Sequence, residues 1–220
     1  MYIGPQIITD GLVLYLDAAN PKSYPGSGTT WYDLSGDGNN STLTNGPTFD
    51  SGNKGSIRFD GTNDSSNFSY DLRSNWTYEC WVKHDTVNGF AFLGQGNVGT
   101  STGLHIWFNA SNRVRFGMYN NDTDVLNLTT QSGKWYHYCF SYQHTSPYTK
   151  KIWRDGVQLS TTTISGPSQY SGTGTVRIAA TYSSGGAYAD GNFAIAKLYD
   201  RVLTTAEIQQ NYNATKNRFK

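Results

Sequence analysis

Two aspartates that are two residues apart, Asp122 and Asp124 in "NNDTDVLN", come nearest in this chain to the spacing of a catalytic pair. Hydrolysis of a glycosidic bond needs two carboxyl groups about 5–10 Å apart, and a strand supplies them at positions i and i+2. Asn and Asp residues surround this pair, however, and acids in such a cluster usually form turns. The pattern E-x-D-x-x-E is also absent from the sequence. We therefore predict that the protein has no catalytic residues and is not an enzyme.

The histidines do not form a second kind of catalytic site. They are scattered along the chain, and no G-x-S-x-G motif accompanies His84, His105, His137 and His144. A serine of that motif needs a strand–turn–helix unit to expose it, and an all-β chain lacks this unit. His137 alternates with apolar residues in "KWYHYCFSY", so we predict a packing role for it.

The chain has two cysteines, Cys80 in "NWTYECWVK" and Cys139 in "KWYHYCFSY". Each alternates with large side chains, so we expect both to point into the core. A buried thiol without a nearby base stays protonated and packs as a small apolar side chain. The cysteines therefore carry information about the fold and provide no nucleophile.

Binding of a sugar needs no acid, because sugar faces stack on exposed aromatic rings while amides and hydroxyls take the oxygens. The candidate ligand contacts are the aromatic residues expected in loops, namely Tyr24, Trp31, Tyr119, Tyr148, Tyr170, Tyr182 and Tyr188. The alternative is that tyrosine is simply the commonest strand and rim residue of this chain. The tryptophans at strand positions are predicted to lie in the core, namely Trp76, Trp81, Trp107, Trp135 and Trp153.

Composition limits both the fold and the partners. The 220 residues carry a formal net charge of +1 and only 15% charged residues, which excludes the basic field that nucleic acids require. The abundance of Gly, Tyr, Asn, Ser and Thr favours strands joined by turns. The longest apolar runs are far shorter than the roughly 20 residues that cross a bilayer, so we expect no membrane insertion. The start "MYIGPQIITDG" lacks the regions of a secretory signal, so we expect the chain to stay in the cytosol until lysis.

Alternating segments recur from "GLVLYL" to "FAIAKLYDR", and Asp155-Gly156 marks a hairpin between two of them. Thr204 and Glu207 form the capping box of one helix, at about residues 204–214. The sequence therefore predicts an all-β fold, a two-sheet antiparallel jelly-roll sandwich with one short C-terminal helix.

The expected organisation is an N-terminal arm at residues 1–10, a single domain at 11–214 and a C-terminal tail at 215–220. Short arms are too small to fold alone, because ordering each residue costs roughly 1–2 kcal/mol of backbone entropy. We expect these arms to order on a partner protein, and the alternative is a pair of frayed ends.

Four stretches, in this order, resemble the laminin-G-like domains of the concanavalin A-like jelly rolls, a group that includes the pentraxins. They are "GLVLYLDAAN…WYDLSGDGNNSTLTNGPTF", "SIRFDGTND", the strands "WTYECWVK" and "KWYHYCFSY", and "FAIAKLYDRVLTTAEIQQNY". The resemblance covers about residues 11–212 and implies a concanavalin A-like fold. It also implies that Cys80 and Cys139 lie on neighbouring strands. Both a disulfide, formed in an oxidising compartment, and a pair of buried thiols remain open.

Many members of this group hold Ca²⁺ between the first loop, the F-D-G turn and an acid on the last strand. By this resemblance the candidate ligands are Asp33, Asp37, Asp60 and Asp64, in loops whose oxygens suit calcium. Where the group often has two acids on the last strand, this chain has Ala194 and Ile195. Loss of carboxylates weakens a calcium site, so we expect that no cofactor is required.

The sequence of residues 11–36, "GLVLYLDAANPKSYPGSGTTWYDLSG", most resembles laminin-G-like domains in structural proteins of tailed phages. The resemblance implies a non-enzymatic virion protein, such as a capsid decoration, fibre or tail-associated protein. Its expected partners are other virion proteins and cell-surface glycans, and its expected location is the virion surface after assembly in the host cytoplasm. The alternatives are a cellular carbohydrate-binding or adhesion module, extracellular or at the cell surface, and, less favoured, a glycosidase.

Overall fold

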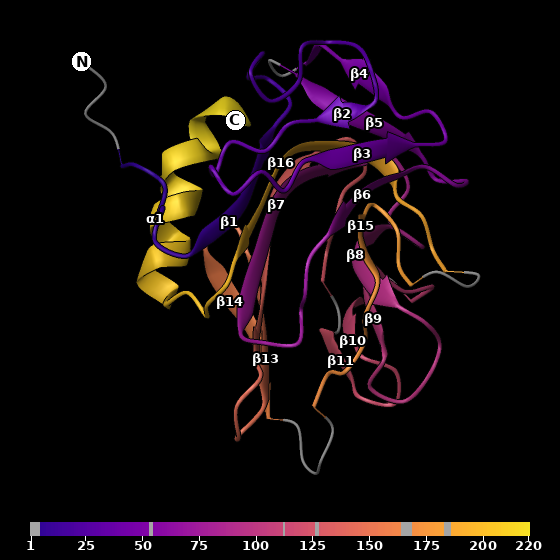
Figure 1. Ribbon diagram of the computed structural model, residues 1–220, viewed down its shortest axis with the longest axis vertical. Helices are drawn as coiled ribbons and strands as arrows, with labels where there is room; N and C mark the ends of the chain where they lie inside the picture. Colours follow the sequence, from indigo (N-terminus) through magenta and orange to yellow (C-terminus); the bar gives the residue numbers. More distant parts are fainter. Residues whose placement is uncertain (1–4, 53–54, 112, 126–127, 164–168, 183–185) are drawn as a thin grey trace.

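The computed structural model describes residues 5–52, 55–111, 113–125, 128–163, 169–182 and 186–220. Two antiparallel sheets lie face to face, and one helix covers the outside of the first sheet (Figure 1). The prediction of a two-sheet jelly-roll sandwich with one short C-terminal helix is confirmed. Among the described residues, no helix is long and apolar enough to cross a membrane.

The first sheet has eight strands. They are β1 (Leu12–Asp17), β4 (Thr48–Asp50), β5 (Ser56–Asp60), β7 (Trp76–His84), β12 (Trp135–Gln143), β13 (Thr149–Arg154), β14 (Val157–Thr163) and β16 (Asp190–Tyr199). Their spatial order is β14-β13-β12-β7-β16-β5-β4, and β1 also pairs with β16. The Asp155-Gly156 hairpin is confirmed, since both residues have the positive φ angles, 52° and 78°, that a tight hairpin turn requires.

The second sheet also has eight strands. They are β2 (Thr30–Trp31), β3 (Ser41–Thr44), β6 (Ser65–Ser69), β8 (Ala91–Gly96), β9 (Gly103–Phe108), β10 (Val114–Gly117), β11 (Asp122–Val125) and β15 (Thr175–Ile178). Their order is β11-β10-β9-β8-β15-β6-β3-β2. In β9 the buried Leu104, Ile106 and Phe108 alternate with residues that face away from the core. This alternation leaves the outer face of the second sheet free to carry polar and aromatic side chains.

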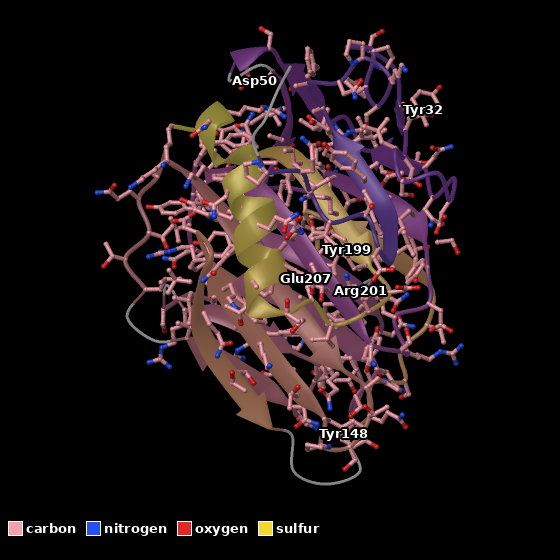
Figure 2. The ribbon with its side chains drawn as sticks, turned by 90° about the vertical axis from the view of Figure 1, so that its left-hand side faces the viewer. Tyr32, Asp50, Tyr148, Tyr199, Arg201 and Glu207 are labelled. Atoms are coloured by element: carbon pink, nitrogen blue, oxygen red, sulfur yellow. The ribbon has the colours of Figure 1, made fainter. Side chains whose placement is uncertain are left out.

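Helix α1 (Thr205–Thr215) begins where the capping box predicts. The Thr204 side chain accepts a hydrogen bond from the Glu207 backbone N–H, and the Glu207 carboxylate accepts one from the Thr204 N–H at 2.7 Å. Arg201 also contacts Glu207 at 2.7 Å, and Figure 2 shows both residues at the start of the helix. On the face toward the sheet, Ile208 is fully buried and Tyr212 stacks on Trp81.

The arm and the tail both pack against the domain itself. Ile8 accepts a hydrogen bond from the Tyr199 hydroxyl through its carbonyl and donates one to the Asn211 side chain through its N–H. The short helix η2 (Lys216–Arg218) follows α1, and the Phe219 ring stacks on Trp81 with 4.3 Å between ring centroids. Residues 5–10 and 215–219 therefore pack against this chain, and their docking on a partner protein stays a prediction.

The two cysteines lie on neighbouring antiparallel strands, β7 and β12, as the resemblance implies. The expectation that both face the same core is wrong. Cys80 lies directly opposite Tyr138, and Cys139 is the next residue along, so its side chain points to the other face of the sheet. Cys80 packs between the sheets and Cys139 beneath α1, and the two thiols are not bonded to each other. The one-residue offset in register is the physical reason.

Candidate functional site

Two rows of side chains cross the outer face of the second sheet, over β9, β10 and β11. Pairing places Trp107, Arg115 and Asp124 side by side in the first row. It places His105, Gly117 and Asp122 side by side in the second. Directly opposite residues share a face of a sheet, so both rows point away from the core.

Gly117 lies at the centre of the second row and lets its neighbours meet. A Cβ atom at this position would overlap both His105 Nε2 and Asp122 Oδ1. Without it, His105 and Asp122 reach over the middle strand to a distance of 3.2 Å. The glycine is therefore required by the close approach of two side chains, since its own φ is not in the left-handed region.

The hairpin turn between β10 and β11 brings two more side chains to the same place. Tyr119 and Asn120 have φ angles of 56° and 64°, the left-handed values that a two-residue hairpin turn needs at both central positions. Such values suit Asn but are strained for tyrosine. Strain of this kind is concentrated at functional sites, so Tyr119 marks the turn as a candidate for binding.

The segment after β15 forms the opposite wall. Gly94 on β8 has no side chain, and a Cβ there would collide with the backbone of Thr181. The chain can therefore lie directly on the sheet, where Thr181 and Ala187 exchange hydrogen bonds. Tyr182 follows and turns its ring toward His105 and Tyr119, at centroid distances of 5.5 and 6.1 Å.

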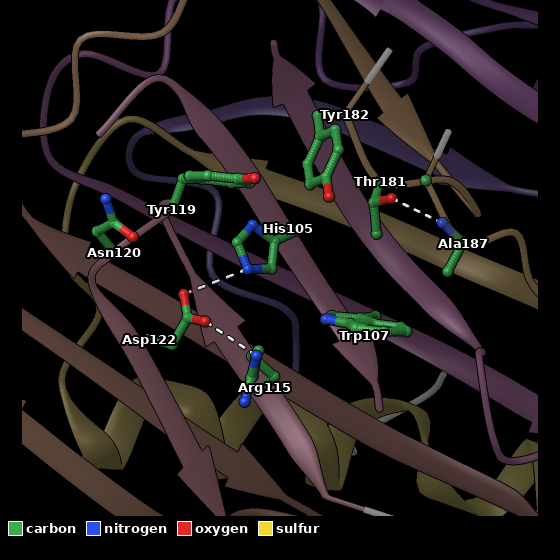
Figure 3. A pocket seen from close by; sticks show the side chains of 10 residues that line it. His105, Trp107, Arg115, Tyr119, Asn120, Asp122, Thr181, Tyr182 and Ala187 are labelled. Atoms are coloured by element: carbon green, nitrogen blue, oxygen red, sulfur yellow. Dashed lines mark hydrogen bonds and ion pairs between the residues drawn. The ribbon is translucent and has the colours of Figure 1, made fainter. Parts of the chain in front are cut away.

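These walls enclose an open pocket of about 570 Å³, which we call the β9–β11 pocket (Figure 3). The volume lies within the range of small-ligand sites, about 300–1,000 Å³. Its lining consists of His105, Trp107, Arg115, Tyr119, Asn120, Asp122, Thr181, Tyr182, Gly186 and Ala187. Three large aromatic rings thus surround a group of planar polar side chains.

Ion pairs hold the polar side chains of the pocket in place. Arg115 binds Asp124 through two parallel contacts, of 2.7 and 2.9 Å, and its Nη1 lies 3.0 Å from Asp122 Oδ2. The His105 ring lies between two acceptors, since Nδ1 is 2.8 Å from the Gly103 carbonyl and Nε2 faces Asp122. Bidentate contacts of this kind fix the orientation of the guanidinium as well as its position.

The environment keeps the Asp122 carboxyl ionised. Burial by itself would raise its pKa, but the hydrogen bond from His105 and the charge of Arg115 outweigh that effect and lower the pKa. The charge of Lys150 also lowers the pKa of Asp122. Lys150 lies behind the turn, where its Nζ donates to the carbonyls of Phe116 and Asn121. Burial lowers the pKa of Lys150 itself to about 8.

The structure brings two of the predicted aromatic contacts, Tyr119 and Tyr182, into this pocket. Tyr188 lies beyond Gly186 and Ala187, in a second hollow beside Asp60 and Asp190. The others contribute to packing and lie away from the pocket: Tyr24, Trp31 and Tyr170 are buried, and Tyr148 packs against the core.

The structure corrects the predictions for three residues on this face of the sheet, Trp107, Asp122 and Asp124. Trp107 was predicted to be a core residue, yet it is only half-buried and lies on the outer face, out of phase with Leu104, Ile106 and Phe108. The interpretation of Asp122 and Asp124 as turn residues is also wrong, because both belong to strand β11 and contact Arg115. The strict alternation of "GLHIWFN" was the signal that could have placed Trp107 beside His105.

Three of the four aspartates suggested as calcium ligands accept hydrogen bonds from backbone N–H groups. The Asp33 carboxylate accepts backbone hydrogen bonds from Tyr15, Ser35 and Asn39. Asp60 accepts one from Thr62, Asp64 accepts one from Asp60, and Asp37 is exposed. Within the described part of the chain, no group of three or more His, Cys, Asp or Glu side chains is arranged to hold a metal ion. Whether this chain binds Ca²⁺ stays a prediction.

A second cluster of titratable side chains is buried under α1. Glu79 is fully buried, with Lys197 in ion-pair contact and His137 Nε2 at 3.6 Å. Burial raises the pKa of Glu79, but the charge of Lys197 and the contacts with His137 and Lys197 together outweigh it and bring the pKa to about 2. His137 is 1% exposed and packs against the Trp81 and Tyr212 rings, a packing position as expected from the sequence.

Comparison with known proteins identifies a family. A family model described as the concanavalin A-like lectin/glucanases superfamily (Laminin_G_3) matches residues 51–209, which is most of the chain. A comparison with curated proteins finds no match.

Solved structures share the fold at low sequence identity. Trypanosoma rangeli sialidase, in complex with 2,3-difluoro-KDN, has a TM-score of 0.71 at 17% identity over 94% of this chain and 33% of its own. This chain therefore spans about a third of that sialidase. Domain 4 of the GH43 extracellular arabinanase AbnA from Geobacillus stearothermophilus, in complex with arabinotriose, has a TM-score of 0.68 at 14% identity over 91% of this chain and 98% of its own. Botulinum neurotoxin type C, whose cell entry depends on two ganglioside molecules, has a TM-score of 0.69 at 11% identity over 94% and 52%. At these identities the likeness shows the fold alone.

Proposed function

Because this chain belongs to the concanavalin A-like lectin/glucanase superfamily, we propose that it is a non-enzymatic, glycan-binding module that uses the β9–β11 pocket. One observation carries the proposal: three aromatic rings surround fixed hydrogen-bonding side chains in a single open pocket. A sugar presents an apolar face and a rim of hydroxyl groups, and it needs both kinds of partner at once.

The side chains of the pocket supply both kinds. The Trp107, Tyr119 and Tyr182 rings offer surfaces for stacking. The Asp122 carboxylate and the Asn120 amide offer acceptors for hydroxyl groups, and ion pairs already hold Asp122 in place. A site that is fixed before the ligand arrives loses less entropy on binding. The complex of the arabinanase domain with arabinotriose supports the proposal, because that structure has the same fold and holds a glycan.

Glycoside hydrolysis is the second candidate, and the placement of Asp122 and Asp124 at i and i+2 on β11 favours it. Hydrolysis also needs one carboxyl that stays protonated near neutral pH, which requires a raised pKa. The pKa of Asp122 is lowered, and Asp124 is engaged by Arg115 through both oxygens. Binding without cleavage is therefore the better proposal, and release of reducing sugar from oligosaccharides above a buffer control would contradict it.

A glycan array followed by calorimetric titration tests the site. Trp107→Ala and Tyr182→Ala should each weaken binding of a retained glycan at least about tenfold, or about 1.4 kcal/mol. Tyr32→Ala is the matched control, because Tyr32 is 45% exposed and does not line the pocket. Melting curves of all three variants establish that they are folded. Equal affinities for the wild type and both pocket variants would show that the glycan binds elsewhere.

We further propose that this module is displayed on a phage virion, as a capsid decoration, fibre or tail-associated protein, with other virion proteins as its partners. The proposal is supported by the sequence of residues 11–36, "GLVLYLDAANPKSYPGSGTTWYDLSG", which resembles laminin-G-like domains of tailed-phage structural proteins. Mass spectrometry of purified particles, together with the identity of the neighbouring genes, tests this setting. Neighbouring genes that encode capsid or tail proteins would support the virion setting. Neighbouring genes that encode cell-surface proteins would support a cellular adhesion module.

A further inference from the structure

Among the described residues, Arg115 is the arginine that lines the β9–β11 pocket, and protein acceptors already engage it. Arg115 gives its Nε and Nη2 atoms to Asp124 and approaches Asp122 with Nη1. These contacts occupy one bidentate edge of the guanidinium and place two carboxylates beside its charge. An anionic ligand would therefore have to share Arg115 with Asp124 and Asp122, which already balance that charge.

The other two basic side chains are also committed. Lys150 is 1% exposed, and its Nζ points to the carbonyls of Phe116 and Asn121 behind the hairpin turn. His105 is 6% exposed and faces the Gly103 carbonyl with Nδ1 and Asp122 with Nε2. Neither side chain presents a free N–H to a ligand in the pocket.

Asp122 and Asn120 present acceptors to the pocket. Each oxygen of the Asp122 carboxylate has one partner, His105 or Arg115, and a carboxylate oxygen accepts two hydrogen bonds. The Asn120 amide nitrogen donates to Thr100 Oγ1 at 3.0 Å, which leaves the amide oxygen as an acceptor. Hydroxyl groups can donate to these atoms, whereas a carboxylate or sulfate carries no proton and would meet the charge of Asp122.

We propose that the β9–β11 pocket selects neutral, hydroxyl-rich sugars and discriminates against sugars that carry a carboxylate or a sulfate. This inference rests on the proposed glycan-binding function and assigns its ligand class. The source of selectivity is the engaged state of Arg115 combined with the ionised carboxylate of Asp122, which repels a like charge and accepts from hydroxyls.

The test uses neutral oligosaccharides paired with acidic derivatives of the same core, such as lactose with 3′-sialyllactose and xylotriose with its glucuronic acid derivative. Calorimetry with the wild-type chain should show each acidic member binding at least about tenfold more weakly than its neutral partner. Affinity for the neutral member should be unchanged between about 50 and 500 mM NaCl, because no ion pair with the ligand is formed.

Asp122→Asn separates charge from shape. Removing this charge should reduce the discrimination against the acidic member, while Asp37→Asn, the same change at an exposed site outside the pocket, should leave it intact. Acidic members that bind as tightly as the neutral ones would overturn the selectivity and leave the glycan-binding function standing. Failure of every neutral and acidic probe would overturn both. The salt dependence of the wild type keeps the test decisive if Asp122→Asn does not fold.

Discussion

At the rim of the pocket, one residue combines backbone strain with a partly exposed ring that lines the pocket. Tyr119 holds a φ of 56°, and a left-handed conformation costs a residue with a Cβ roughly 1–2 kcal/mol. A turn selected for stability would place Asn or Gly there. The tyrosine is therefore best explained by its ring, which lies opposite Tyr182 at the pocket.

Tyr119→Asn is expected to raise the free energy of unfolding by about 1 kcal/mol, because Asn tolerates the left-handed conformation. The same variant should weaken binding of the glycan. Urea denaturation and calorimetric titration measure the two effects. Tyr32→Asn, at another exposed tyrosine, should change neither. A loss of stability in Tyr119→Asn would mean that packing of the ring outweighs the strain.

His84 gives the fold a dependence on pH. The ring is fully buried among Phe90, Phe108 and Tyr138, and neither of its nitrogens has a hydrogen-bond partner. Burial disfavours the charged imidazolium and lowers the pKa of His84 to about 3. In the unfolded chain the pKa of a histidine is about 6.5.

As the pH falls, the unfolded chain protonates His84 near pH 6.5, whereas the folded chain does so only near pH 3. The contribution of His84 to stability is therefore complete above about pH 6.5. It is lost as the pH falls from about 6.5 towards 3, with a limiting slope of about 1.4 kcal/mol per pH unit. Urea denaturation between pH 7 and 5 measures the slope. His84→Leu should flatten it in this window, and an unchanged slope in that variant would assign the effect to other groups.

Among the elements, α1 depends on its first turn. Thr204 and Glu207 satisfy each other's backbone N–H groups, and Arg201 holds the Glu207 carboxylate. The side-chain hydrogen bond from Arg201 is the main cause that lowers the pKa of Glu207 to about 2. The helix covers Cys139 and Trp153 on the first sheet. The burial of these two side chains therefore depends on the cap that stabilises the helix.

Thr204→Ala should reduce the free energy of unfolding by about 1 kcal/mol, the usual effect of losing an N-cap side chain. Thr204→Ser keeps the hydroxyl and should retain most of that stability. Chemical denaturation at neutral pH compares the two. Equal stability of the Ala and Ser variants would show that the Arg201–Glu207 contact is sufficient to hold the turn.

For the whole molecule, the two ends of the chain stabilise one face of the sandwich. Ile8 is tied to Tyr199 and Asn211, and the Asn211 side chain continues to the buried Glu79 at 3.2 Å. At the other end, Arg218 reaches Asp17 at 2.6 Å. Contacts near both ends of the sequence therefore hold α1 and the segment after it against the first sheet.

Deleting residues 1–9 should lower the free energy of unfolding by a few kcal/mol, because it removes at least two partly buried hydrogen bonds of about 1 kcal/mol each together with the packing of Ile8. Ile8→Ala keeps the backbone contacts and should lose less. Urea denaturation of both, beside the full chain, measures the difference. A deletion variant as stable as the full chain would return the arm to the role of a free docking segment.

Local patterns were enough for the class of fold. The alternation of "WTYECWVK" and "KWYHYCFSY", the Asp155-Gly156 turn and the Thr204–Glu207 box each depend on residues close in sequence. The interactions that form these features act within one turn or one strand. The features can therefore be predicted without knowing which strand pairs with which. Neighbouring central strands followed from the family resemblance.

The site needed the tertiary structure, because it depends on register between strands. A shift of one residue separates Cys80 from Cys139 by the thickness of a sheet. Register also aligns Trp107 with Arg115 and Asp124, three residues that no local pattern joins. Tyr119 and Tyr182 meet only because a hairpin turn and the segment after β15 reach the same face. The register of β9, β10 and β11 and the path of the segment after β15 are tertiary features, and together they assemble the pocket.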